Sequence, residues 1–192
     1  MKEILKLIFT LTVISSAAGL LLAYTYKVTA APILAASQQG ASQALAAVLP
    51  PFDNNPSTST NMFKEGDTDW TFYVARKGGK FTGAAFETTS QNGYGGEIKI
   101  MVGITAAGQI KSIQILSQHE TPGLGTKIAE APFLTQFAGK SIKDTVWAVK
   151  KDNGNFDAVT GATISSRAVL EAIGMGVATY TKHSAVIART GE

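Results

Sequence analysis

The stretch that decides the fold is residues 97–116, EIKIMVGITAAGQIKSIQIL. In its first half, β-branched residues occupy every second position, which places them on one face of a strand. Ala107 and Gly108 interrupt the run, and a second strand-like run follows at residues 110–116. Two such runs around a short turn predict an antiparallel hairpin.

The same organisation is predicted upstream of this hairpin. Residues 70–75 and 81–87 are expected to be strands joined by RKGGK, whose glycines suit a hairpin turn. Downstream, residues 126–137 predict a helix with a break at Pro132, and residues 145–149 predict a further strand. The fold class is therefore α+β, with a mainly antiparallel sheet and flanking helices.

A small-residue turn and a helix follow near the C-terminal end, in the sequence DAVTGAT (residues 157–163) and ISSRAVLEAIGMGVATY (residues 164–180). Apolar residues recur at helical spacing in the second segment, with Ser165 and Ser166 where capping residues belong. The turn places the hydroxyl of Thr163 directly ahead of the predicted helix.

The N-terminus of a helix holds anions, because it has unpaired N–H groups and a partial positive charge. Gly161 and Ala162 leave room for a bulky phosphorylated group beside the hydroxyl of Thr163. The turn is therefore interpreted as an anchor for a phosphate ester. The alternative is an ordinary Ser/Thr-rich helix cap.

A second motif, HETPGLG (residues 119–125), follows the predicted strand 110–116. Its proline and glycines favour a loop with a defined backbone shape that can lie flat against a planar ring. The sequence GYGG at residues 93–96 is interpreted as a glycine-rich loop between strands, although it would also let the backbone approach a ligand.

DAVTGAT resembles the flavinylation signature of the FMN-binding domain family, in which the last threonine of a GAT turn carries FMN through a phosphoester bond. Thr163 occupies the matching position. HETPGLG with a downstream TGAT resembles one group in that family: the G subunit of Rnf ion-translocating oxidoreductases and the C subunit of sodium-pumping quinone reductases. The stretch ALAAVLPPFDN (residues 44–54) resembles the region after the membrane helix of these subunits.

The sequence departs from the family pattern at two positions. Many relatives have Ser two residues before the glycine and Thr two residues after the modified threonine, where this chain has Val159 and Ser165. Neither change removes the acceptor hydroxyl. Thr160 is a competing acceptor, but it precedes the glycine, so Thr163 is the expected site.

The resemblance implies covalent FMN on Thr163, attached by a dedicated flavin transferase that uses FAD as donor. Leu124 would contact the ring, the loop amides would donate to its polar edge, and Asp157 would either present the acceptor or stiffen the turn. The expected FMN contacts are Glu120, Thr121, Gly123, Leu124, Gly125, Asp157, Thr160, Gly161, Ala162 and Thr163. We expect no catalytic residue and no metal ligand, since HETPGLG lacks the second His of a zinc-binding HExxH helix.

Composition excludes several classes of protein. There is no cysteine, which rules out disulfides, thiolate-bound iron–sulfur clusters and haem attached through CxxCH. The net charge is only +3, and Lys and Arg are scattered without basic runs, so no nucleic-acid partner is expected. If the chain carries electrons, an organic cofactor must hold them.

The N-terminus predicts a membrane anchor. Residues 7–26 form an uncharged, mostly apolar run, and a bilayer-spanning helix needs about 20 such residues. The excess of positive charge at residues 1–6 favours a cytoplasmic N-terminus and a domain on the opposite side. A cleaved signal peptide is the alternative.

The predicted organisation is then a juxtamembrane helix and linker over residues 27–60 and an FMN-binding domain over residues 61–192. The helix within the first of these is expected at residues 30–49, with Pro32 in its first turn and Pro50 after its end.

The resemblance implies a covalently flavinylated electron-transfer subunit of a membrane-bound Rnf-type complex that couples electron transfer between ferredoxin and NAD to ion translocation. Its partners would be the other subunits, the flavin transferase and the inner membrane, with the flavin domain on the extracytoplasmic side. The alternatives are a quinone reductase C subunit, which is usually longer, and an unflavinylated, membrane-anchored scaffold module.

Overall fold

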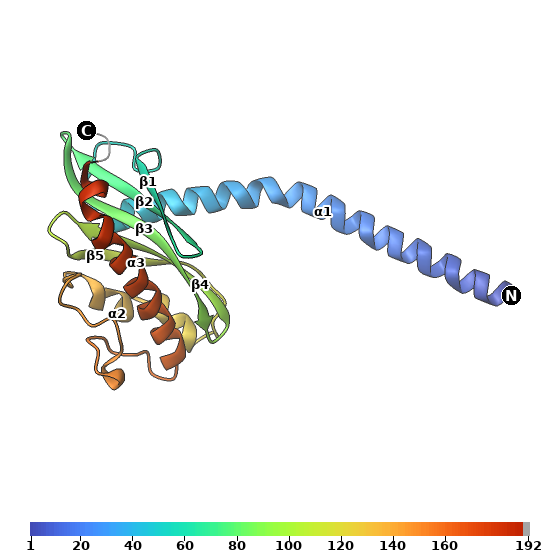
Figure 1. Cartoon of the computed structure of the whole chain (residues 1–192). Coiled ribbons are helices and arrows are strands. Elements are labelled where there is room, and N and C mark those ends of the chain that lie inside the picture. The colour runs from blue at the N-terminus through green and yellow to red at the C-terminus, as the bar shows by residue number, and fades with distance from the viewer. Residues whose placement is uncertain (190–192) are drawn as a thin grey trace. The chain divides into compact units, whose positions relative to one another are not determined.

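The computed structural model describes residues 1–189, apart from the side chains at positions 37 and 38 (Figure 1). The chain divides into two compact units, Met1–Gly40 and Ala41–Glu192. The first unit is helical, and the second contains a five-stranded sheet with helices. The predicted α+β class is confirmed.

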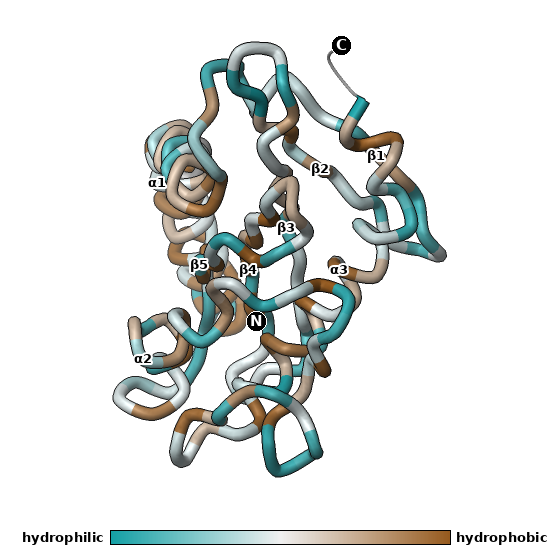
Figure 2. The backbone as a smooth tube through the Cα atoms, turned by 90° about the vertical axis from the view of Figure 1, so that its left-hand side faces the viewer, coloured by the Kyte–Doolittle hydropathy of each residue, from teal (hydrophilic) through white to brown (hydrophobic). Residues whose placement is uncertain are grey.

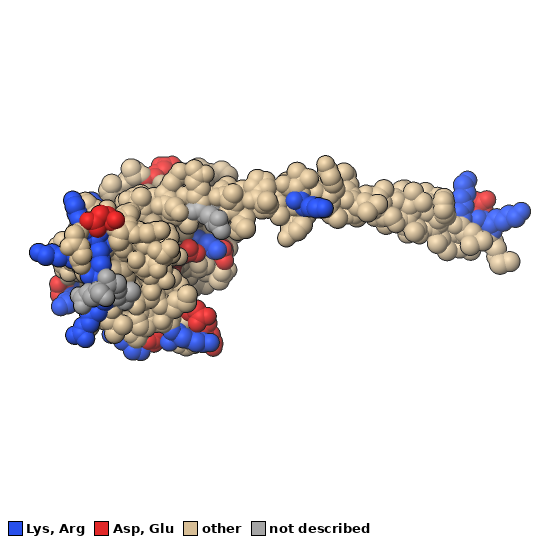
Figure 3. All heavy atoms as spheres, turned by 90° about the horizontal axis from the view of Figure 1, so that it is seen from above, with Lys and Arg blue, Asp and Glu red and all other residues tan. Residues whose placement is uncertain are grey.

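A single helix, α1 (Lys2–Val48), replaces the separate helix expected at residues 30–49. Pro32 lies inside α1 rather than in the first turn of a new helix. The helix ends just before Pro50, as predicted. Its most apolar 18-residue window has a mean hydropathy of 2.0, so its length and composition suffice to cross a membrane. Figure 3 shows charged side chains at the start of α1 and few along the stretch that follows.

The sheet has the strand order β1-β2-β3-β4-β5, and every neighbouring pair is antiparallel. The strands are β1 (Thr60–Glu65), β2 (Thr68–Lys77), β3 (Lys80–Gly93), β4 (Gly96–Thr105) and β5 (Ile110–Gln118). Both predicted hairpins, β2–β3 and β4–β5, are confirmed. In the first, Gly78 and Gly79 have φ values of 57° and 74°, a left-handed conformation that glycine adopts without steric cost.

Strand β1 is absent from the sequence prediction. Its apolar residues Met62 and Phe63 are adjacent and do not alternate with polar ones, so no period of two is visible. The strand predicted at residues 145–149 is wrong. Only Val149 is paired there, in an isolated parallel bridge with Phe156.

The helix predicted at residues 126–137 is instead three short pieces: η1 (Gly125–Ala129), α2 (Ala131–Leu134) and η2 (Thr135–Phe137). Pro132 stands at the start of α2, where its missing N–H leaves no hydrogen bond unmade, and the interruption lies before it at Glu130. A further turn, η3 (Lys150–Asp152), precedes the segment that leads into the last helix.

Helix α3 (Thr163–Arg189) extends well beyond the predicted residues 164–180 and covers one face of the sheet. Side chains such as Phe72 and Phe86 point to this face and form the main core with Ile173. Gly176 lies so close to the sheet that a Cβ there would clash with the ring of Phe86. This close approach fixes where α3 lies along β3.

The opposite face of the sheet has a smaller core. The last turns of α1 place Leu45 and Val48 against Ala85 and Met101, whose side chains point away from α3. Figure 2 shows hydrophobic and polar residues interspersed along the strands, as expected for strands with alternating faces. The end of α1 therefore belongs to the second compact unit and covers its sheet.

Candidate functional site

The turn before α3 has the geometry that its small residues allow. Gly161 has a φ of 80°, and the N–H of Ala162 donates to the carbonyl of Val159 at 2.9 Å. A Cβ on Gly161 would be strained by this φ and would meet the side chain of Leu124 at 3.3 Å. The turn thus brings the TGAT sequence against the HETPGLG loop, and α3 begins at Thr163.

The expected capping role of Ser165 and Ser166 is wrong. Both residues lie inside the first turns of α3 and are buried, with 1% and 0% of their surface exposed. The hydroxyl of Ser166 accepts the N–H of Val159 at 3.0 Å and donates to the carbonyl of Ala162 at 2.9 Å, which ties the turn to the helix. Ser165 instead donates to the carboxylate of Glu120 at 2.8 Å.

The HETPGLG loop folds back on itself before η1. The carbonyl of Thr121 accepts the N–H groups of Leu124 and Thr126, and the hydroxyl of Thr126 accepts the N–H of Gly123 at 3.0 Å. Gly123 has a φ of 74°, which favours glycine at this position. The loop is therefore held in the defined shape that its proline and glycines predict, and Leu124 is left 47% exposed.

The two motifs and the β3–β4 turn surround one open pocket of about 500 Å³. This volume lies in the range of small-molecule sites. Its lining residues are Tyr94, Glu120, Thr121, Leu124, Gly125, Gly161, Ala162, Thr163, Ile164 and Ser165. Seven of the ten residues expected to contact FMN thus meet in a single pocket.

Three of the expected residues do not line this pocket. Asp157 and Thr160 line a neighbouring groove of about 400 Å³ on the other side of the turn, together with Lys127. Gly123 is exposed and lines neither. Asp157 forms an exposed ion pair with Lys150 at 2.7 Å, and the amide of Gln136 holds its backbone through both N–H and carbonyl.

The hydroxyl of Thr163 is available for chemistry. Thr163 is partly exposed, and within residues 1–189 its hydroxyl has no hydrogen-bond partner in the protein. It stands on the first residue of α3, where the leading N–H groups have no acceptor within the helix. An anion attached there would meet these donors and the positive end of the helix dipole.

Glu120 is the buried charged residue of the pocket wall, with 5% of its surface exposed. One carboxylate oxygen accepts the hydroxyl of Ser165 at 2.8 Å, and the other accepts the N–H of Gly95 at 3.4 Å. Its own N–H donates to the side chain of Gln118 at 2.6 Å. These contacts join the loop, the β3–β4 turn and helix α3 through one side chain.

Sequence reasoning missed three pocket residues: Tyr94, Ile164 and Ser165. Tyr94 is 71% exposed and Ile164 50% exposed, so with Leu124 they give the pocket an apolar rim. Exposed apolar side chains that gather in one place can mark a binding site, but their exposure becomes visible only in the structure. His119 is exposed and does not line the pocket.

A groove of comparable size, about 480 Å³, lies where β2 separates from β3. It contains neither motif and no helix N-terminus. We therefore place the site at the α3 pocket. Within residues 1–189 no group of three His, Cys, Asp or Glu side chains is placed to bind a metal ion.

Comparison with known proteins points to the same region. Residues 93–177 match the family model described as the FMN-binding domain, which spans both motifs and every residue that lines the α3 pocket.

The chain is similar over most of its length to proteins named as the G subunit of an ion-translocating oxidoreductase complex. The protein of Cereibacter sphaeroides is 37% identical, over 89% of this chain and 81% of that protein. The protein of Pseudomonas aeruginosa is 36% identical, over 80% of this chain and 77% of that protein. The protein of Aliivibrio fischeri is also 36% identical, over 90% of this chain and 88% of that protein.

Two crystal structures share the fold. NqrC of Shewanella oneidensis superposes with a TM-score of 0.52 at 21% identity, over 69% of this chain and 70% of that chain. The C subunit of the Na⁺-translocating NADH-quinone reductase from Parabacteroides distasonis gives a TM-score of 0.51 at 23% identity, over 65% of each chain.

Proposed function

The chain belongs to the family of ion-translocating oxidoreductase complex G subunits, and on this premise we propose that it is a membrane-anchored electron-transfer subunit that carries FMN covalently on Thr163. The proposed complex is of the Rnf type, coupling electron transfer between ferredoxin and NAD to ion translocation. A quinone reductase C subunit is the weaker alternative, because the relatives that match at 36–37% identity are named as G subunits.

The observation that carries this proposal is the position of Thr163. Its hydroxyl is unpartnered among the described residues, partly exposed, and located at the first residue of α3 on the wall of the pocket. A phosphoester there would lie at the helix N-terminus, where N–H groups and the dipole stabilise negative charge.

The pocket suits the flavin ring as well as its phosphate. Two glycines in the pocket wall could not be replaced without strain. A Cβ on Gly125 would lie 2.6 Å from a carboxylate oxygen of Glu120. Gly161 has a left-handed backbone conformation that favours glycine. Leu124, Tyr94 and Ile164 supply an apolar rim for a planar ring. Bound FMN would supply one-electron chemistry, while the protein orients the ring and sets its electrostatic surroundings.

Attachment would be catalysed by a flavin transferase with FAD as donor. The oxygen of Thr163 would form a bond to the FMN phosphorus, AMP would leave, and the hydroxyl proton would be lost to solvent or to the transferase. Thr160 and Asp157 line the groove on the other side of the turn and are exposed, so they are accessible to an enzyme that acts on this turn.

The apolar part of α1 is proposed to remain as a single membrane anchor, with the flavin domain on the extracytoplasmic side. Covalent attachment fits that location, because a dissociated cofactor could not be replaced there from a cytoplasmic pool. The remaining subunits of the complex would supply the NAD and ferredoxin sites and the ion path.

The test is the mass of the denatured full-length chain after co-expression with a flavin transferase. We expect a gain of one FMN less water, mapped to the peptide containing Thr163. Thr163→Val should abolish the gain. Thr160→Val is the matched control, since it removes a hydroxyl from the same turn but outside the pocket, and it should retain the gain.

An unmodified wild-type chain in the presence of active transferase would contradict the proposal and favour an anchored scaffold module. Flavin that persists in Thr163→Val but disappears in Thr160→Val would move the acceptor to Thr160.

A further inference from the structure

Glu120 is buried without a positive partner. Among residues 1–189, no Lys, Arg or His nitrogen lies within 4.0 Å of its carboxylate. Its hydrogen-bond donors are neutral: the Ser165 hydroxyl and the Gly95 N–H, one to each oxygen. Two donors on the two oxygens fit an ionised carboxylate, which can only accept.

Glycines lie next to this carboxylate on two sides, where any side chain would clash with it. A Cβ on Gly93 would lie 2.6 Å from one carboxylate oxygen, and a Cβ on Gly125 would lie 2.6 Å from the other. Gly95, the weak donor, has the carbonyl of His119 so close that no side chain fits. Two glycines therefore flank the buried carboxylate, and a third lies against the backbone next to it.

We propose that Glu120 is a fixed negative charge that lowers the reduction potential of the flavin in this pocket, with Ser165 as the positioning residue that holds it. This inference rests on the proposed function, because it requires FMN at the α3 pocket.

The direction follows from electrostatics. An electron that enters the ring adds negative charge beside a carboxylate that is shielded from water and has no counter-ion, so reduction is disfavoured. Ser165 is the third residue of α3, so its hydroxyl holds the carboxylate near the positive end of the helix dipole.

The experiment compares Glu120→Gln with wild type in the full chain, loaded by the transferase. Gln keeps the size of the side chain and an oxygen that accepts a hydrogen bond but removes the charge. Glu130→Gln is the matched control, because Glu130 carries the same charge ten residues further along and is exposed. Covalent flavin content and midpoint potential are measured separately.

We expect a more positive potential for Glu120→Gln than for wild type and Glu130→Gln, measured on the flavin-loaded fraction of each protein. The expected shift corresponds to about a tenfold larger equilibrium constant for one-electron reduction, or about 59 mV. Loaded Glu120→Gln with the potential of wild type would overturn the inference and leave the proposed function intact. Absence of flavin from wild type would instead refute the proposed function.

A second measurement needs no flavin. Infrared spectroscopy of the unloaded chain at neutral pH should show an ionised-carboxylate band that is lost in Glu120→Gln. If the lost band is that of a protonated carboxyl group, Glu120 is not a fixed charge and the inference fails, even when the variant cannot be loaded.

Discussion

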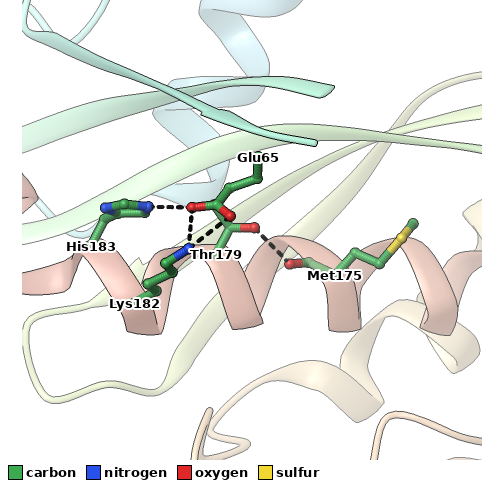
Figure 4. A network of polar contacts seen from close by, with 5 residues as sticks. All are labelled: Glu65, Met175, Thr179, Lys182 and His183. Atoms are coloured by element: carbon green, nitrogen blue, oxygen red, sulfur yellow. Dashed lines mark hydrogen bonds and ion pairs between the residues drawn. The ribbon is translucent and has the colours of Figure 1, made fainter. Parts of the chain in front are cut away.

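The two ends of helix α3 each hold a carboxylate from another element, but in different ways. At the N-terminal end, Ser165 donates to Glu120, which is 5% exposed and has neutral donors. At the C-terminal end, Glu65 of β1 binds Lys182 at 2.7 Å and His183 at 2.8 Å, and its side chain is 30% exposed (Figure 4).

The Glu65 cluster is a structural contact between two elements, whereas Glu120 belongs to the wall of a pocket. The hydrogen bonds from Lys182 and His183 hold the pKa of the Glu65 carboxyl below its ordinary value. The ring of His183 also stacks on Phe63 at 4.0 Å between centroids, so this cluster attaches β1 to α3. The Glu120 carboxylate has no such positive partner among residues 1–189, and a pocket lies beside it. Burial of a carboxylate without a positive partner costs stability, and its position beside the pocket supports the role proposed for Glu120.

The largest effect on stability is expected from Ser165→Ala. Removing this hydroxyl leaves one oxygen of a buried carboxylate without a donor, which should lower the free energy of unfolding by about 2 kcal/mol. The measurement is urea unfolding of the unloaded full chain in detergent.

Thr179→Val is the matched control on the same helix. Its hydroxyl donates only to the carbonyl of Met175 one turn earlier, which leaves no other group unsatisfied when it is removed (Figure 4). The expected loss is below about 0.5 kcal/mol. Equal losses in the two variants would show that the two ends of α3 do not differ in the way described.

The sequence predicts the local elements around the α3 pocket better than the contacts between them. The β4–β5 hairpin follows from alternation in a continuous stretch, and the position of Thr163 at the start of a helix follows from small residues ahead of a helical repeat. Both are local patterns of the chain. The α3 pocket therefore contains seven of the ten residues that were selected from the two motifs.

The contact between Ser165 and Glu120 is not local, because the two residues are 45 positions apart in the chain. A serine near the start of a helix has the same local pattern whether it caps the helix or binds a distant carboxylate, and only packing separates the two roles. The register that brings Gly95 to Glu120 depends likewise on the β3–β4 turn. The role of Ser165 and the position of Gly95 are thus set by tertiary contacts, which the motifs alone do not predict.

A smaller effect is expected at the C-terminal end, and it should depend on pH. Because the folded-state pKa of Glu65 is lowered, its contribution to stability is present above the ordinary value of 4.5 and is lost as the pH falls through the folded pKa. The stability difference between wild type and Glu65→Gln should therefore be present at neutral pH and shrink below about pH 4.5.

Thermal unfolding across this pH range provides the measurement, with Glu171→Gln as the control. Glu171 is an exposed carboxylate on the same helix whose contact is the neutral side chain of Asn92, so its removal should give no such pH dependence. A wild-type advantage over Glu65→Gln that persists unchanged in acid would show that the carboxylate charge of Glu65 is not the source of the stability.

The smallest effect is expected from Arg167→Lys, which tests whether burial or position on the helix makes the two ends differ. Arg167 lies near the N-terminal end of α3 and binds Asp152 through two hydrogen bonds of 2.7 and 2.8 Å, but both side chains are well exposed, at 48% and 39%. These bonds lower the pKa of the Asp152 carboxyl. Lys keeps the charge and loses the paired geometry.

If burial is decisive, Arg167→Lys should leave the melting temperature and the flavin potential almost unchanged, because solvent screens an exposed pair. Its loss of stability should be smaller than that of Ser165→Ala, although both residues lie in the first turns of α3. A loss of stability as large as that of Ser165→Ala would show that position at the helix N-terminus causes the effect. The expected smaller loss would show that the burial of Glu120 causes it.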